Sequence, residues 1–236
     1  MRYVKDSTGR FSMRPHYEPT ELDHECEKVL IAFLGGTIPV PIETDDLARL
    51  IERDTSDFDP GADLRMYGAD VEGVTEFKPG RKPRVRIVAE LAYDEVRLNR
   101  YRTTLTHEYG HVHFHAHLFD AQPQVADLFN PRVASGGEQV CKRDAIINAR
   151  KTDWMEWQAG YVCGALLMPI GHFRRVVSGY QETHKIFGPV ALGTERATAL
   201  IDTVCREFRV SADAARVRLS QHGYVQAQDR GRSLFG

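Results

Sequence analysis

The sequence predicts an α+β protein, and two kinds of pattern carry this prediction. Apolar residues recur at helical spacing in several long segments, one of which, around residues 99–119, contains the sequence His-Glu-Tyr-Gly-His. Between residues 63 and 91 the pattern changes to short alternating runs separated by Gly, Pro and basic residues, which is typical of a small antiparallel sheet. The chain has 236 residues, enough to bury a sizeable core, either as one large domain or as one domain with a small appendage.

Composition narrows the class of protein. The formal net charge is -2, so no global field favours nucleic acid or an anionic membrane as a partner. The four cysteines stand far apart without a Cys-x-x-Cys pair, which favours reduced thiols over a disulfide framework. The N-terminus has no apolar signal region, and no later stretch has the length of a membrane span. We therefore expect a soluble, cytoplasmic protein that does not bind membranes.

The N-terminal third of the chain predicts a leader and two helices. Residues 1–18 mix Gly, Ser, Pro and charge without periodicity, so we expect a flexible leader. Glu18-Pro19-Thr20-Glu21 is a typical helix start, and Gly35-Gly36 ends the apolar repeat that follows it. A second helix begins at the capping sequence Glu43-Thr44-Asp45-Asp46.

The alternating region predicts roughly three strands, at residues 64–68, 73–77 and 85–88. A sheet placed directly before a metal-binding helix can form the upper wall of a protease cleft, with its edge strand free to pair with an extended peptide. Alternatively, the sheet only covers the core. The sequence leaves both interpretations open.

The rest of the chain is predicted to be mainly helical. The motif helix should run from about residue 99 to 119, a loop should cover 120–140, and no order is expected after 225. Further helices are predicted at about 153–167, 172–179, 194–208 and 214–221. The last two, with Ser211 as N-cap, have helix-turn-helix character, although we favour two packed helices without a binding role. The predicted divisions are a leader (1–18), a main domain (19–190), a C-terminal helical segment (191–226) and a flexible tail (227–236).

The motif itself predicts a metal site. On a helix, His107 and His111 lie one turn apart on the same face, where two imidazole nitrogens can hold one zinc ion. Glu108 then lies beside the metal, where it can accept a proton from a water molecule. A catalytic zinc site needs a third protein ligand and one open position.

Three further histidines follow the motif, and we expect none of them to be the third ligand. His117 has the spacing of an extended motif that requires Gly at the position of Phe114, where the helix would have to break. On an unbroken helix His117 lies about 9 Å beyond His111 along the axis, and His115 about 6 Å beyond it. His113 points away. We interpret all three as part of a solvated, polar helix surface.

Glu156 is the preferred third ligand. It lies in a second predicted helix, where Trp154, Met155 and Trp157 suggest a buried setting and the small residues Ala159 and Gly160 allow close approach to the motif helix. A buried carboxylate without a partner would be costly, and two His with one Glu is a known catalytic zinc set. Cys141 could act as a latch on the open coordination position, but an ordinary thiol is the favoured interpretation.

These motifs resemble the ImmA/IrrE family of metallopeptidases. The resemblance is carried by the segment from Arg100 to His111, by Glu156-Trp157-Gln158-Ala159, and by Ala165-Leu166-Leu167-Met168-Pro169, and it covers roughly residues 60–225. Thr103 departs from the Phe that is usual in the family's lead-in. The resemblance implies a zincin-like metallopeptidase domain in a cytoplasmic zinc-dependent endopeptidase, which often cleaves a helix-turn-helix repressor encoded beside it. By this match His107, His111 and Glu156 bind Zn²⁺, and Glu108 is the general base.

Two classes of function therefore compete. The first is peptide hydrolysis, for which Tyr180, His172 and His184 are candidate oxyanion donors by residue type alone. The second is a DNA-binding or toxin-antitoxin regulatory protein with a structural zinc site, for which the C-terminal arginines form a local basic cluster (Arg206, Arg209, Arg216 and Arg218). Glu108 favours catalysis, because a structural site has no use for it. Nucleic-acid binding stays open.

Overall fold

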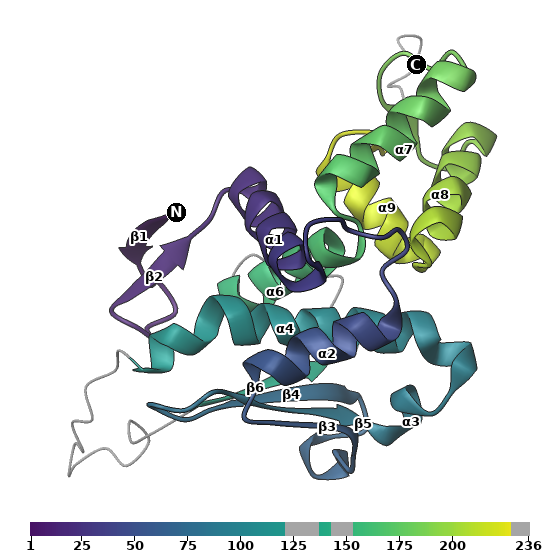
Figure 1. Cartoon of the computed structure of the whole chain (residues 1–236). Helices are drawn as coiled ribbons and strands as arrows, with labels where there is room; N and C mark the ends of the chain where they lie inside the picture. Colours follow the sequence, from purple (N-terminus) through teal and green to yellow (C-terminus); the bar gives the residue numbers. More distant parts are fainter. Residues whose placement is uncertain (121–136, 143–152, 228–236) are drawn as a thin grey trace, which may run out of the picture.

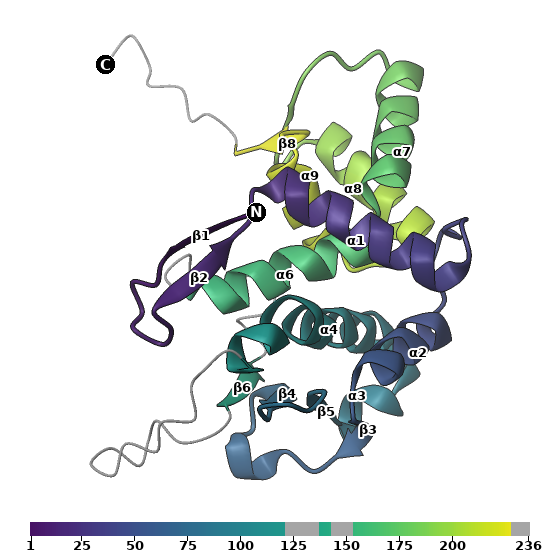
Figure 2. The same cartoon turned by 60° about the vertical axis from the view of Figure 1, so that its left-hand side comes forward.

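A computed structural model describes residues 1–120, 137–142 and 153–227, and for 138–142 it describes the backbone alone. A sheet forms one side of the molecule, the long helix α4 lies across it, and α1 and α6 cover α4 from the other side (Figure 1). The C-terminal helices α7, α8 and α9 lie farthest from the sheet, as a second view also shows (Figure 2). The elements are β1 Arg2–Lys5, β2 Met13–His16, α1 Pro19–Leu34, α2 Thr44–Asp54, β3 Asp57–Ala62, η1 Arg65–Tyr67, β4 Val71–Phe77, β5 Arg84–Val88, α3 Ala89–Ala92, η2 Glu95–Arg97, α4 Leu98–Asp120, β6 Gly137–Lys142, α6 Trp154–Leu167, α7 Ile170–Thr183, β7 Val190–Ala191, α8 Glu195–Phe208, α9 Ala212–Gln221 and β8 Val225–Gln226.

The helices form where caps and periodicity predict them. At the start of α1, Pro19 occupies the first turn and the backbone N–H of Glu18 donates to the Glu21 carboxylate (2.9 Å). Gly35 ends this helix in the left-handed region (φ 77°), which a residue with a side chain rarely adopts. Thr194 and Ser211 cap α8 and α9 through their hydroxyl groups. The helix predicted at 172–179 is longer than expected, because α7 covers Ile170–Thr183.

The sheet differs from its prediction. It has four strands in the order β3-β5-β4-β6, and β3 runs parallel to β5, so the sheet is mixed rather than antiparallel. The predicted strand at 64–68 is instead the 3₁₀ turn η1. Strand β3 precedes this turn and contains Pro60 and Gly61, which weaken any strand signal in the sequence.

A second expectation was wrong, because strand β6 (Gly137–Lys142) begins inside the segment 120–140 that was predicted to be a loop. It pairs antiparallel with β4 from Gly137, opposite Phe77, to Lys142, opposite Val71. Strand β4, which lies nearest to α4, is therefore flanked on both sides, by β5 and β6, and β6 is an edge strand of this sheet. The paired residues of β4 and β6 are sixty or more positions apart in the chain, so no local sequence pattern predicts this pairing.

The predicted flexible leader is also wrong, because residues 1–16 contain an antiparallel hairpin, β1–β2. The Asp6 carboxylate holds its turn by accepting hydrogen bonds from the backbone N–H groups of Thr8 (2.9 Å) and Phe11 (3.0 Å). It also accepts one from the indole N–H of Trp154 (3.2 Å), at the start of α6. Two four-residue strands are too short to show periodicity, so this order depends on contacts with a distant helix.

The core is centred on the contact between α4 and α6. A Cβ added to Gly110 of α4 would lie 3.0 Å from the Ala159 Cα of α6, so the missing side chain allows the two helices to approach closely. The largest buried apolar cluster continues into the C-terminal helices through Leu200, Val204 and Phe208. The segment 191–226 therefore shares its core with the rest of the molecule. No helix within the described ranges is both long and apolar enough to cross a membrane.

Candidate metal centre

Helix α4 carries the motif and is buried almost all round. The predicted apolar positions Leu105, Tyr109 and Val112 are buried, but so are several polar residues between them. The Thr106 hydroxyl donates to the Arg102 carbonyl (2.9 Å), which satisfies it within the helix. A buried polar group normally needs such a partner. The buried polar side chains of α4 that this backbone pattern does not satisfy include His107, Glu108 and His111.

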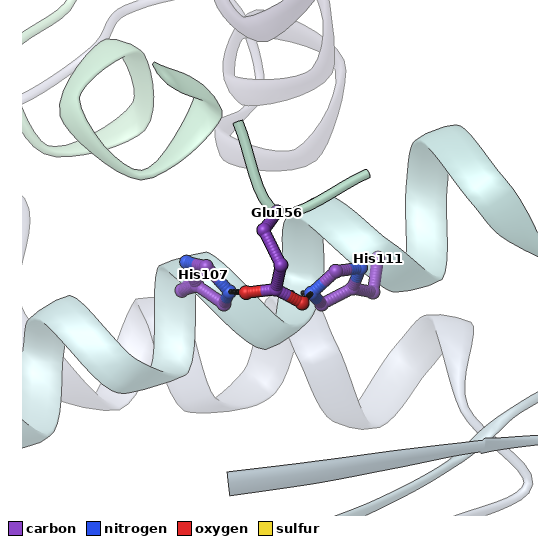
Figure 3. Close-up of side chains that lie close together, drawn as sticks. All are labelled: His107, His111 and Glu156. Atoms are coloured by element: carbon purple, nitrogen blue, oxygen red, sulfur yellow. Dashed lines mark hydrogen bonds and ion pairs between the residues drawn. The ribbon is translucent and has the colours of Figure 1, made fainter. Parts of the chain in front are cut away.

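Two of these side chains, His107 and His111, converge with Glu156 of α6. The Nε2 atom of His107 lies 3.2 Å from Oε2 of Glu156, and Nε2 of His111 lies 3.2 Å from Oε1 of Glu156. The two Nε2 atoms are 3.2 Å apart. Figure 3 shows the Glu156 carboxylate between the two imidazole rings, each of which turns its Nε2 atom toward it. The three residues that the sequence selected are therefore together in space, and all are buried.

The geometry fits a metal ion. One donor atom from each residue lies within 4.8 Å of the others. Metal–ligand bonds of about 2.0–2.2 Å in a tetrahedral arrangement place neighbouring ligand atoms about 3.4 Å apart, close to the separations seen here. Two imidazoles and one carboxylate are donors that suit a divalent transition-metal ion. The cluster can thus hold a metal ion with little rearrangement.

Electrostatics in the cluster are governed by the histidine–glutamate contacts. Burial would raise the pKa of Glu156, but attraction to His111 and hydrogen bonds with His107 and His111 outweigh it and hold that pKa well below its ordinary value. Burial would likewise lower the pKa of His111, but the charge of Glu156 raises it. Glu156 is therefore ionised at neutral pH, which is the state that a metal ligand needs.

Glu108 lies beside the cluster, against strand β4. Its Oε2 accepts a hydrogen bond from the Thr75 hydroxyl (2.5 Å), while its Oε1 has no hydrogen-bond partner among the described residues. A Cβ added to Gly73 would lie only 2.3 Å from Oε1, so the glycine makes room for the carboxylate. Burial raises the pKa of Glu108, and the neighbouring His111 and His107 offset this only in part. Glu108 is thus a fully buried carboxyl group whose pKa is shifted toward neutrality.

The histidines after the motif divide into three environments. His117 is exposed, with its Nε2 atom 3.4 Å from the Tyr3 hydroxyl, and His113 is partly buried beside Glu25 (3.5 Å), as expected for residues outside the metal cluster. His115 is fully buried, so its assignment to a solvated surface was wrong. It lies one turn after His111 and faces α6, with its Nδ1 atom 3.0 Å from Nδ1 of His111. Burial and the neighbouring His111 hold the pKa of His115 well below its ordinary value.

The remaining candidates lie elsewhere. The rings of Tyr180 and His184 pack against each other at the end of α7, with centroids 4.2 Å apart and a tilt of 33°, and line a cavity against α8. His172 lies near the start of α7. In both views α7 lies on the side of the molecule away from the sheet (Figures 1 and 2). The side chain of Cys141 lies outside the described part of the chain, although its backbone is opposite Gly73 in the β4–β6 pair.

The residues that sequence reasoning missed are those that surround the cluster. Gly73 and Thr75 contact Glu108 from β4, and Gln158 contacts His115 from α6. His115 was missed as well, although its position four residues after His111 places it on the same face of α4 and was a signal in the sequence.

Comparison of the chain with protein-family models, with curated proteins and with solved structures found no match. The interpretation of the site therefore depends on its own geometry and on the motifs.

Proposed function

We propose that this protein is a zinc-dependent endopeptidase of the cytoplasm. The observation that carries the proposal is the buried cluster of His107, His111 and Glu156. Glu108 lies next to His107 on α4 and is buried as well. Zinc, when bound there, would polarise the scissile carbonyl group and lower the pKa of a water molecule toward neutrality. Two histidines and one glutamate leave a fourth position open, as a catalytic rather than a structural site requires.

Glu108 is the proton carrier in this proposal. Its raised pKa suits a group that must accept a proton from the attacking water and then donate it to the leaving amine near neutral pH. Thr75 holds one carboxylate oxygen, which leaves Oε1 for the proton. The site lies between the sheet on one side and α6 on the other and is buried, so bulk water is excluded and every charge interaction within it is strengthened.

The proposed substrate is a partner protein, a helix-turn-helix repressor, whose cleavage would control genes of a mobile element or a stress response. This part of the proposal rests on the resemblance to the ImmA/IrrE metallopeptidases. A structural feature compatible with a peptide substrate is strand β6, which ends the sheet beside β4. An edge strand can accept an extended peptide through backbone hydrogen bonds.

The competing DNA-binding function finds less support in the C-terminal helices. Arg218 is buried and paired with Asp23 (2.6 Å). Arg209 and Arg216 of the local basic cluster also contact carboxylates. These pairs are Arg209–Glu43 (3.0 Å) and Arg216–Asp213 (3.2 Å). Charges already paired within the protein contribute less to phosphate binding.

The test is the substitution Glu108→Gln, with Glu182→Gln on the surface of α7 as the matched control. The glutamine keeps the shape of the side chain but cannot carry the proton, so we expect unchanged zinc content and a loss of repressor cleavage of about 10²–10⁴-fold. Zinc content is measured by metal analysis. Cleavage is measured as the loss of the intact repressor when it is co-expressed with the protein. Unchanged cleavage by the Glu108→Gln protein would overturn the peptidase assignment and favour a structural zinc site.

A further inference from the structure

The ligand His111 is connected to the N-terminal hairpin by a series of buried hydrogen bonds. Its Nδ1 atom lies 3.0 Å from Nδ1 of His115, and Nε2 of His115 lies 3.1 Å from Oε1 of Gln158. The amide nitrogen of Gln158 donates to the backbone carbonyl of Pro15 in β2 (3.1 Å). His111, His115 and Gln158 are each at most 1% exposed, so water does not replace these contacts.

The direction of each hydrogen bond follows from the last acceptor. The carbonyl of Pro15 can only accept, so the NH₂ group of Gln158 faces it and the amide oxygen faces His115. That oxygen needs a donor, which places the proton of His115 on Nε2 and leaves its Nδ1 as an acceptor. Nδ1 of His115 then accepts the proton of His111 Nδ1. As a consequence, Nε2 of His111 is the nitrogen whose lone pair a metal ion would take, whereas in the metal-free protein a proton on this nitrogen joins it to Glu156 (3.2 Å).

We propose that His115 and Gln158 are positioning residues that select the tautomer of His111 and fix the direction of its Nε2 lone pair toward the metal. The inference rests on the metal site put forward under the proposed function, and it assigns a role to the N-terminal hairpin. In metal sites, the hydrogen bond to the outer nitrogen of a ligating histidine sets both its tautomer and its orientation. Here a neutral imidazole fills this role.

Two further observations support the assignment. The rings of His115 and Trp154 form a T-shaped contact, with centroids 5.4 Å apart and planes at 88°, and the indole N–H of Trp154 donates to Asp6 of the hairpin turn. The ring of His115 is thus fixed from the hairpin as well as from α6. The second observation is a contrast: Nδ1 of His107 is buried and has no hydrogen-bond partner in the described part of the chain. Of the two imidazole ligands, only His111 is oriented in this way.

A neutral outer partner also suits the charge of the site. Glu156 and Glu108 already place two carboxyl groups in a buried region, and a third beside His111 would add a further desolvated charge. An imidazole accepts the same proton without adding negative charge. The series therefore orients the ligand at little electrostatic cost.

The first experiment determines the tautomer by long-range ¹H–¹⁵N NMR of the histidine rings, in metal-free and zinc-loaded protein. We expect His115 as the Nε2–H tautomer in both states. Protonation of His115 on Nδ1 would overturn the inference. This result does not depend on peptidase activity.

The second experiment measures zinc affinity by competition with a chelator. His115→Phe keeps a ring of similar size but removes the acceptor, and we expect it to weaken zinc binding by about 10–100-fold. His113→Phe is the matched control, because it changes the same residue type two positions away, beside Glu25, and should leave affinity unchanged. If His115→Phe does not fold, Gln158→Met, which removes the partner of His115, should weaken zinc binding in the same direction.

The outcomes separate this inference from the proposed function. A His115→Phe or Gln158→Met protein that binds zinc as tightly as the unaltered protein overturns the inference and leaves the zinc site intact. An unaltered protein that takes up no zinc overturns the proposed function instead. Cobalt substitution provides a spectroscopic check, since a misdirected His111 would change the visible absorption of the bound ion.

Discussion

Helix α6 contributes to two buried polar clusters that are built on opposite principles. Near its start, Glu156 meets His107 and His111; farther along, Tyr161 meets Asp23 of α1 and Arg218 of α9. In the second cluster, which we call the Asp23–Arg218 cluster, Nη2 of Arg218 lies 2.6 Å from Oδ1 of Asp23 and 3.3 Å from the Met168 carbonyl. The Tyr161 hydroxyl donates to the other Asp23 oxygen (3.0 Å).

The difference between the clusters is the source of positive charge. The Asp23–Arg218 cluster contains a cation, an anion and hydroxyl and carbonyl partners, so the chain alone balances it. The metal cluster brings three electron-pair donors within 4.8 Å of one another, together with the carboxyl group of Glu108. Such a set is balanced only by protons or by an added cation. An added cation could therefore replace the protons of the metal cluster, whereas the Asp23–Arg218 cluster already contains its own cation.

The largest expected effect is a difference in stability between the Asp23→Ala and Glu156→Ala proteins. Asp23→Ala leaves Arg218 buried without its anion, and we expect it to lower the free energy of unfolding by about 3–5 kcal/mol. Glu156→Ala leaves two histidines, which unlike Arg218 can lose their protons and become neutral, so metal-free stability should fall less than in Asp23→Ala, while zinc binding should be lost. Urea unfolding of the metal-free proteins, together with metal analysis, measures both.

The opposite outcome for Glu156 would change the ligand set. Normal zinc content in the Glu156→Ala protein, combined with loss of zinc in His117→Ala, would make His117 the third ligand. The structure argues against this, because His117 is exposed and contacts Tyr3. Equal losses of stability in the Asp23→Ala and Glu156→Ala proteins would remove the distinction between the clusters.

A pair of glycines provides the next comparison. A Cβ at Gly73 would lie 2.3 Å from Glu108 Oε1, whereas a Cβ at Gly164 would lie 3.5 Å from Arg218 Cδ, an ordinary contact. Gly73→Ala should displace Glu108 and reduce cleavage by roughly 100-fold, because such small displacements have effects of that order. Zinc content should stay unchanged, since Gly73 contacts no ligand side chain in the metal cluster as described.

Gly164→Ala is the control for that substitution. It lies within α6, where alanine is favoured over glycine by about 1 kcal/mol, so the protein should be as stable or more stable and should cleave normally. Full activity in the Gly73→Ala protein would mean that Glu108 does not need its observed position.

The smallest expected effect is a pH dependence in the Asp23–Arg218 cluster. Burial and the neighbouring Arg218 lower the pKa of His222 from 6.5 to about 4, even though Asp23 favours its charged form. Because the folded pKa is lower, the unfolded chain binds the proton more readily between these values. The contribution of His222 to stability is therefore complete above pH 6.5 and is lost as the pH falls toward 4.

His222→Gln should remove this part of the pH dependence. We expect a difference on the order of 1 kcal/mol between the variant and the unaltered protein at low pH, after allowance for solvent screening. Thermal unfolding between pH 7 and pH 4 measures it, with the exposed His184→Gln as a surface control. A His222→Gln profile that parallels the unaltered protein would exclude His222 as the titrating group.

Much of the site could be predicted because helical geometry is local. The four-residue spacing of His107 and His111 determines that both face one side of α4. Pro19 in the first turn of α1 and the N-caps Thr194 and Ser211 define helix starts within a few residues. Glu156 was found through the types of residue that surround it. Each of these inferences needs only neighbours in the sequence.

The sequence by itself thus determined the α+β class, the principal helices and the selection of His107, Glu108, His111 and Glu156. Only the tertiary structure decided that the sheet is mixed, that β6 flanks β4, and that Gln158 connects His115 to Pro15. The physical reason is range. Helical hydrogen bonds join residues four apart, whereas strand pairing and buried polar contacts join residues that become neighbours only when the whole chain has folded.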